Sequence, residues 1–179
     1  MIRLFAAIAV PGPIGQALAL RQHGLREARW RPLEAFHITL RFFGEVTEDR
    51  ARDLDEALLE VSGRPLSLAL DGVGAFGEGR DIHAVWAGVA EDPGLRRLAA
   101  RCEKAARASG VAADTRAYRP HVTLAYLRRA DPEAVAAWIE ANGLLKSPPF
   151  PVDRFGLYSS WRTSAGSRYR LEAEYPLND

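Results

Sequence analysis

Short stretches in which apolar residues alternate with polar or small ones run through most of the chain, and this alternation predicts β-strands. Between positions 66 and 70, for example, leucine stands at every second position, separated by Ser67 and Ala69. Strands are expected at 2–10, 36–43, 66–70, 82–89, 118–127, 150–160 and 168–175. The last two are expected to form a hairpin across 164–167.

The segments between these strands carry apolar residues at helical spacing. Between 93 and 110 one helical face would hold Leu95, Leu98 and Cys102. Asp92-Pro93 provides an N-cap and a first-turn proline, and Gly110 provides a C-terminal stop. Helices are expected at 14–28, 48–61, 93–110 and 132–142. Cys102 is therefore interpreted as a buried small apolar residue.

Two of the predicted strands contain the same four-residue motif. His37-Ile38-Thr39-Leu40 returns as His121-Val122-Thr123-Leu124, although the chain has only four histidines. Successive side chains of a strand point to opposite faces, so each copy is expected to present its histidine and threonine on one face and its aliphatic pair on the other.

The order of predicted elements also repeats. A shift by 84 positions, the spacing of the two motifs, places the helix at 48 on the helix at 132 and the strand at 66 on the strand at 150. We therefore expect a single α+β domain over 1–179. Its two pseudo-twofold-related lobes, formed by about 1–75 and 80–179, would contain mainly antiparallel sheet with outer helices and share one central cleft. The glycine-rich segment 73–79 is expected to be the joint between the lobes or a loop at the edge of the cleft.

Composition narrows the class of protein. The net charge is +1 with 26% charged residues, so no global basic field marks a protein that coats long nucleic acids, and an anionic ligand must be held locally. A single cysteine excludes an internal disulfide and favours a reducing, cytoplasmic location. No apolar run is long enough for a membrane span, and the first residues lack a signal-peptide core, so we expect a soluble protein. We also expect it to be a monomer.

Two histidines facing one cleft can divide the work of an in-line displacement at phosphorus. One imidazole takes a proton from the nucleophile while the other gives a proton to the leaving oxygen. The ordinary pKa of histidine, about 6.5, suits both tasks, and the two threonine hydroxyls can donate hydrogen bonds to the phosphate oxygens. This chemistry needs no metal or other cofactor, and the chain has no His-Glu-x-x-His motif and no glycine-rich phosphate loop.

The motifs and their flanks, at 36–44 and 118–125, resemble the 2H phosphoesterase superfamily. Within it, the chain is most similar to the bacterial and archaeal RNA 2',3'-cyclic phosphodiesterases, also called 2'-5' RNA ligase-like proteins. The resemblance implies that His37 and His121 are catalytic and that Thr39 and Thr123 bind the phosphate. It implies opening of a 2',3'-cyclic phosphate, on an RNA 3' end or a nucleotide, to a 2'-phosphate. His37 would protonate the departing 3' oxygen and His121 would activate water, although the symmetry of the motifs does not decide between these roles.

One position departs from the superfamily pattern. An arginine often stands five residues after the second histidine as a further phosphate contact, and Tyr126 stands there in this chain. Arg41 has the parity of His37 and Thr39 on a regular strand and is a candidate substitute. Further substitutes are Arg119, Arg128 and Arg129, and the candidates for stacking on a base at the cleft rim are Phe43, Phe76, Tyr126 and Trp161.

Three alternatives remain open at this point. The same chemistry in reverse would join a 2',3'-cyclic end to a 5'-hydroxyl with a 2'-5' linkage. A cyclic phosphodiesterase can also act on a small metabolite such as an ADP-ribose cyclic phosphate. A non-catalytic module that binds RNA ends or nucleotides would retain the groove, but it would not require two imidazoles.

Overall fold

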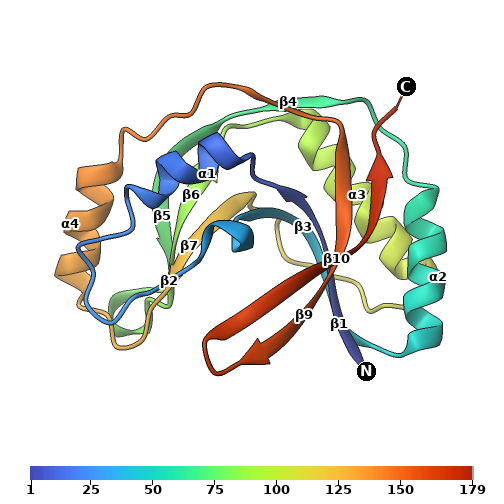
Figure 1. Cartoon of the computed structure of the whole chain (residues 1–179), viewed down its shortest axis with the longest axis horizontal. Helices are drawn as coiled ribbons and strands as arrows, with labels where there is room; N and C mark the ends of the chain where they lie inside the picture. Colours follow the sequence, from blue (N-terminus) through green and yellow to red (C-terminus); the bar gives the residue numbers. More distant parts are fainter. Residues whose placement is uncertain (179) are drawn as a thin grey trace.

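The computed structural model describes residues 1–178 and contains two four-stranded sheets that face each other in Figure 1. The first sheet has the order β10-β9-β1-β3, with β10 at Gly166–Pro176, β9 at Arg154–Thr163, β1 at Ile2–Ala9 and β3 at His37–Val46. The second has the order β2-β7-β6-β5, with β2 at Arg29–Trp30, β7 at His121–Tyr126, β6 at Ala84–Val89 and β5 at Leu70–Phe76. A third, two-stranded sheet pairs β4 at Leu66–Leu68 with β8 at Phe150–Val152. All the strand pairs are antiparallel, so the predicted α+β class is confirmed.

Neither four-stranded sheet is formed by one half of the chain alone. The first sheet joins β1 and β3 to the C-terminal hairpin of β9 and β10, and the second joins β2 and β5 to β6 and β7. Each sheet therefore combines strands from both halves, which differs from the expectation of one lobe at about 1–75 and another at 80–179. The predicted strand at 66–70 is divided between β4 and β5, which pair with different partners.

Within residues 1–178, four α-helices lie outside the sheets: α1 at Gly12–Ala19, α2 at Glu48–Leu59, α3 at Pro93–Ala108 and α4 at Pro132–Asn142. Helices α2 and α3 cover the first sheet, and α1 and α4 lie on the side of the second (Figure 1). The predicted N-cap at Asp92 is confirmed, since its side chain accepts a hydrogen bond from the backbone N–H of Leu95, and Thr47 caps α2 in the same way through the N–H of Arg50. None of the helices among residues 1–178 has the length and apolar character needed to cross a bilayer.

Helix α1 is shorter than its predicted range of 14–28. Beyond Ala19 the backbone adopts left-handed conformations at Gly24 and Glu27, with φ of 87° and 60°, which a helix cannot contain. Hydrogen bonds to other parts of the chain hold this segment instead. Gln22 Nε2 donates to the carbonyls of Arg31 and Leu124 at 2.8 and 3.1 Å. Tertiary contacts thus override the helical pattern after Ala19.

The glycine-rich segment is mostly strand β5 rather than the expected joint or loop, and the packing of β5 against β6 requires one of its glycines. A Cβ atom on Gly74 would lie 2.4 Å from the ring of Trp86, its pairing partner on β6. Only a glycine therefore allows the indole of Trp86 to lie across β5.

The aliphatic residues of both motifs face the core, as predicted. Ile38, Val122 and Leu124 are completely buried and Leu40 is 4% exposed. Cys102 is also fully buried, and burial raises the pKa of its thiol to about 12, so it behaves as the expected apolar core residue.

Candidate active site

His37 is the first residue of β3 and lies in an aromatic pocket made by the first sheet. Its ring centroid is 4.5 Å from that of Tyr158, 5.7 Å from Tyr169 and 5.9 Å from Phe5. Burial lowers its pKa to about 4, the carbonyl of Ala35 opposes this shift, and the charge of Arg31 adds to it. The imidazole of His37 is therefore neutral at neutral pH in the free protein.

His121 occupies the equivalent place in the second sheet as the first residue of β7. Its Nδ1 lies 2.7 Å from the carbonyl oxygen of Arg119, two residues earlier, which leaves Nε2 available for proton transfer. Its ring packs against Phe76, with centroids 4.8 Å apart, and near Trp86 at 6.1 Å. Burial lowers its pKa as well.

Both motif strands contain a β-bulge at the leucine of the motif. On β3, Thr39 pairs with Ala7 and Arg41 with Ala6, so Leu40 is the extra residue. On β7, Thr123 pairs with Trp86 and Ala125 with Val85, so Leu124 is the extra residue. A bulge reverses the alternation of side chains beyond it. The two motifs are therefore alike in register as well as in sequence.

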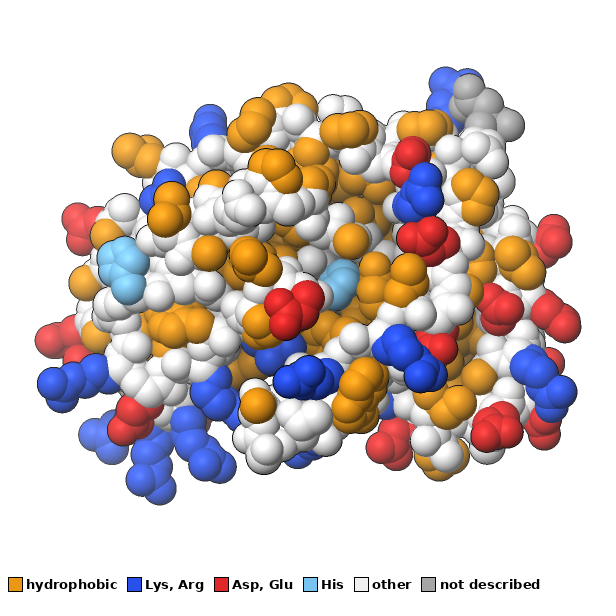
Figure 2. Space-filling view, viewed as in Figure 1, with side chains coloured by type: hydrophobic (Ala, Val, Ile, Leu, Met, Phe, Trp, Pro, Cys, Tyr) orange, Lys and Arg blue, Asp and Glu red, His pale blue; other side chains and the backbone are white. Residues whose placement is uncertain are grey.

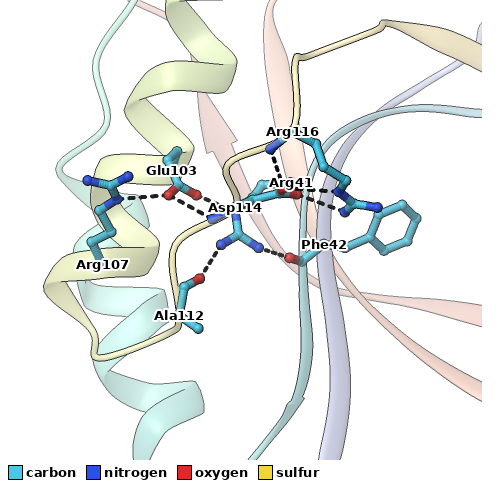
Figure 3. Close-up of polar contacts among 7 residues, drawn as sticks. All are labelled: Arg41, Phe42, Glu103, Arg107, Ala112, Asp114 and Arg116. Atoms are coloured by element: carbon cyan, nitrogen blue, oxygen red, sulfur yellow. Dashed lines mark hydrogen bonds and ion pairs between the residues drawn. The ribbon is translucent and has the colours of Figure 1, made fainter.

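The bulge corrects the prediction made for Arg41, because this residue is on the opposite face from Thr39. Arg41 pairs with the core residue Ala6, is 8% exposed, and forms an ion pair with Glu103 of α3 (Figure 3). It also donates to the carbonyl of Ala112 at 2.6 Å. These contacts tie Arg41 to α3 and to the segment after it, away from the face of the two histidines.

The bulge at Leu40 also changes which aromatic residue of β3 is available for stacking on a base. Phe43 is a core residue with 6% exposure, whereas Phe42 pairs with Phe5 on the face of His37 and is 52% exposed. The prediction of Phe43 as a rim residue is therefore wrong, and Phe42 takes its place. On β7 the equivalent residue is Tyr126, which returns to the face of His121 and is 37% exposed.

The structure also contains one cleft residue that the sequence analysis overlooked. Arg31 follows β2, is 8% exposed, and has its guanidinium carbon 5.5 Å from the ring centroid of Tyr126 and 5.4 Å from that of Tyr169. It lies between the predicted helix at 14–28 and the predicted strand at 36–43, in a segment for which the sequence predicted no element, so the sequence held no signal for its position. Arg119, Arg128 and Arg129 are exposed residues beside β7.

The face around the motifs combines these groups in a shallow hollow. Strands β3 and β7 are in contact, and Tyr118, just before β7, hydrogen-bonds to the backbone of β3. Figure 2 shows a hollow lined with hydrophobic side chains in which a histidine is visible, with basic side chains gathered along its lower edge. Within residues 1–178, no three His, Cys, Asp or Glu side chains are grouped so that they could hold a metal ion.

Comparison with known protein families supports the resemblance seen in the motifs. Residues 12–163 match the model of the 2'-5' RNA ligase superfamily. The chain belongs to this superfamily. The match includes both motifs, with His37, Thr39, His121 and Thr123.

Curated relatives in this superfamily carry the name RNA 2',3'-cyclic phosphodiesterase. The relative from Archaeoglobus fulgidus is 33% identical over 172 residues, which cover 94% of this chain and 97% of the relative. The relative from Escherichia coli K12 is 33% identical over 171 residues, covering 93% and 92%. The chain spans 47% of the length of a longer relative from Geobacillus stearothermophilus.

Solved structures confirm the fold. The crystal structure of Escherichia coli LigT complexed with 3'-AMP has a TM-score of 0.81 at 27% identity and covers 99% of each chain. A protein from Thermus thermophilus has a TM-score of 0.79 at 25% identity and covers 98% of this chain and 97% of its own.

Proposed function

We propose that this protein hydrolyses 2',3'-cyclic phosphates, at RNA 3' ends or on nucleotides, to 2'-phosphates. The observation that carries this proposal is the equal placement of His37 and His121, each at the start of a motif strand, two residues before a threonine and three before the bulge. Two relatives 33% identical over more than nine tenths of the chain carry the name of this activity, which supports the same conclusion.

The reaction needs two proton transfers on opposite sides of the phosphorus. A neutral imidazole takes a proton from water as its oxygen forms a bond to phosphorus, and a protonated imidazole gives a proton to the 3' oxygen as the P–O3' bond breaks. The hydroxyls of Thr39 and Thr123, on the same face as the two imidazoles, donate hydrogen bonds to the non-bridging oxygens as negative charge develops there.

We assign the acid to His37 and the base to His121. In the free protein His37 is neutral, so it must gain a proton when substrate binds. The negative charge of a bound phosphate raises the pKa of a nearby imidazole, and neutralisation of the Arg31 charge removes one of the causes that lower the pKa of His37. His121 has Nδ1 held by a backbone carbonyl, which leaves its Nε2 lone pair for the water proton.

The test of the activity is turnover of the four nucleoside 2',3'-cyclic phosphates and of a short RNA ending in one, with products identified by phosphorus NMR. Changing His37 or His121 to Ala should each lower kcat about 10²- to 10⁴-fold, because general acid–base catalysis contributes that much. Ile38→Ala and Val122→Ala, on the opposite face, should lower stability and leave kcat nearly unchanged. Normal kcat in either histidine variant would favour the binding module instead.

A substrate with sulfur in place of the 3' oxygen tests the division of roles. A thiolate leaves without a proton, so this substrate should restore the rate of His37→Ala and not of His121→Ala. Restoration of His121→Ala would reverse the two roles. Activity should also survive excess EDTA, and its loss with recovery on adding a divalent ion would contradict a mechanism that uses two imidazoles alone.

We further propose that the protein acts as a monomer in the cytoplasm. The single cysteine, Cys102, is a free, buried thiol, which fits a reducing compartment. Ligation is the alternative within the same site. It would break the same P–O3' bond with a 5'-hydroxyl in place of water as the nucleophile, and an RNA with a 5'-hydroxyl added to the assay would reveal a 2'-5' product.

A further inference from the structure

Arg31 connects the two sheets at the cleft. Its backbone N–H donates to the carbonyl of Leu124 on β7 at 2.8 Å, and its Nη2 donates to the carbonyl of Ser167 on β10 at 3.2 Å. Its guanidinium lies close to the rings of Tyr126 from the second sheet and Tyr169 from the first. The planar group is therefore held in one place by both sheets.

The charge of Arg31 has no carboxylate partner among residues 1–178. The ion pairs formed by described residues all involve other cations. Arg41, which is equally buried at 8% exposure, provides the contrast, since it is paired with Glu103. A buried guanidinium that uses few of its five donors is costly unless a ligand uses the rest. The unused donors and the unbalanced charge of Arg31 indicate an anion.

The surroundings of Arg31 place that anion on the face that carries the two motifs. Tyr169, which packs against the guanidinium, also packs against the ring of His37. Tyr126, on the other side, is on the β7 face that carries His121 and Thr123. An anion bound by Arg31 is therefore beside the pocket of His37 and on the β7 face that carries His121 and Thr123.

We propose that Arg31 binds a non-bridging oxygen of the cyclic phosphate and of the 2'-phosphate product, the role for which the sequence suggested Arg41. This inference rests on the proposed function and names a substrate-binding residue of that site. The guanidinium lies over the ring of Tyr126, so it brings a positive charge to the position where the superfamily often has an arginine side chain.

The experiment compares Arg31→Gln with Arg41→Gln, two arginines of equal burial. Arg31→Gln should lower kcat/KM for a nucleoside 2',3'-cyclic phosphate on the order of 10²-fold, as expected for loss of one preorganised donor to the phosphate. Arg41→Gln should lower the unfolding midpoint in urea and keep kcat/KM within about threefold, because its partners lie on α3 and the following segment. Adding Tyr126→Arg to Arg31→Gln should recover part of the lost rate, because the side chain at position 126 lies on the same face and beside the Arg31 guanidinium.

Binding separates phosphate recognition from a purely structural bridge between the sheets. The wild-type protein should bind adenosine 2'-phosphate more tightly than adenosine by calorimetry, and Arg31→Gln should reduce this difference about tenfold or more while Arg31→Lys retains part of it. If Arg31→Gln kept kcat/KM and this difference in affinity, or if it lost activity only in proportion to unfolded protein, Arg31 would be a structural residue and the inference would be wrong. The binding measurement needs no turnover, so failure of the proposed activity with intact phosphate binding through Arg31 is a distinguishable result.

Discussion

The hydroxyl of Tyr118 donates a hydrogen bond to the backbone carbonyl of Thr39 at 2.9 Å. This bond links the segment just before the second motif to the first motif. Tyr118 lies three residues before His121, and Thr39 lies two residues after His37. Burial raises the pKa of the Tyr118 phenol, which keeps the hydroxyl protonated and able to donate. This bond helps set the two sheets, and with them the two imidazoles, at a fixed separation.

Tyr118→Phe should therefore affect the rate more than stability alone explains. Loss of one hydrogen bond costs about 1 kcal/mol of unfolding free energy, whereas a small displacement of one motif relative to the other should lower kcat on the order of 10-fold. The matched control is Tyr175→Phe, which removes a hydrogen bond of 2.5 Å to Asp55, a residue of α2. Equal kcat for the two variants, measured under conditions where both are folded by circular dichroism, would contradict this role.

Phe42 and Phe43 form a pair of neighbours with opposite expected effects. Phe43→Ala should lower the free energy of unfolding by about 3–5 kcal/mol because it empties a core position. Phe42→Ala should leave stability nearly unchanged and raise KM for a nucleoside cyclic phosphate about 5- to 150-fold, because its exposed ring is placed to stack on the base, an interaction of about 1–3 kcal/mol. Urea unfolding and steady-state kinetics on both variants test the pair. A KM effect confined to Phe43→Ala would reverse the assignment.

Gly74→Ala should disturb His121 from a distance. The added Cβ cannot coexist with the present position of Trp86, and the indole of Trp86 packs near the ring of His121. We expect a loss of about 1–3 kcal/mol in stability and a lower kcat with His121 itself unchanged. Gly12→Ala is the control, because nothing lies within 4 Å of a Cβ at that glycine. A Gly74→Ala protein with normal kcat and stability would show that β5 adapts without moving Trp86.

The sequence was sufficient to predict the α+β class, the helix caps and the two histidine–threonine pairs, because these depend on local patterns. It was not sufficient beyond Leu40 and Leu124, where a bulge reverses the alternation that placed Arg41 and Phe43 in the site. A bulge depends on pairing with another strand, so a rule of alternation within one strand cannot reveal it. Arg31 was missed for a related reason. Its position between two sheets follows from contacts with residues more than 90 positions away, which no local pattern encodes.

The two lowered histidine pKa values predict an acid-shifted pH profile. One imidazole must be neutral and the other protonated, so kcat/KM should rise through the lower pKa and fall through the higher, whichever residue is the acid. With the pKa of His37 lowered to about 4 and that of His121 also below its usual 6.5, the maximum should lie between about pH 4 and 6.5. The kcat profile should be shifted to higher pH, because a bound phosphate raises both pKa values.

Burial is the larger cause of the lowered pKa of His37, and Arg31→Gln tests the smaller contribution of the Arg31 charge. It removes a positive charge that lowers the pKa of His37, so the acid limb of kcat/KM should move upward in pH. The lowered pKa also affects stability: the unfolded chain takes up a proton near pH 6.5 that the folded His37 does not, so stability falls as the pH drops from about 6.5 to 4. Thermal unfolding must be measured at each pH so that a fall in rate caused by unfolding is separated from one caused by titration of the imidazoles. A kcat/KM maximum above pH 7.5 in folded protein would mean that neither imidazole titrates in the free site as its burial requires.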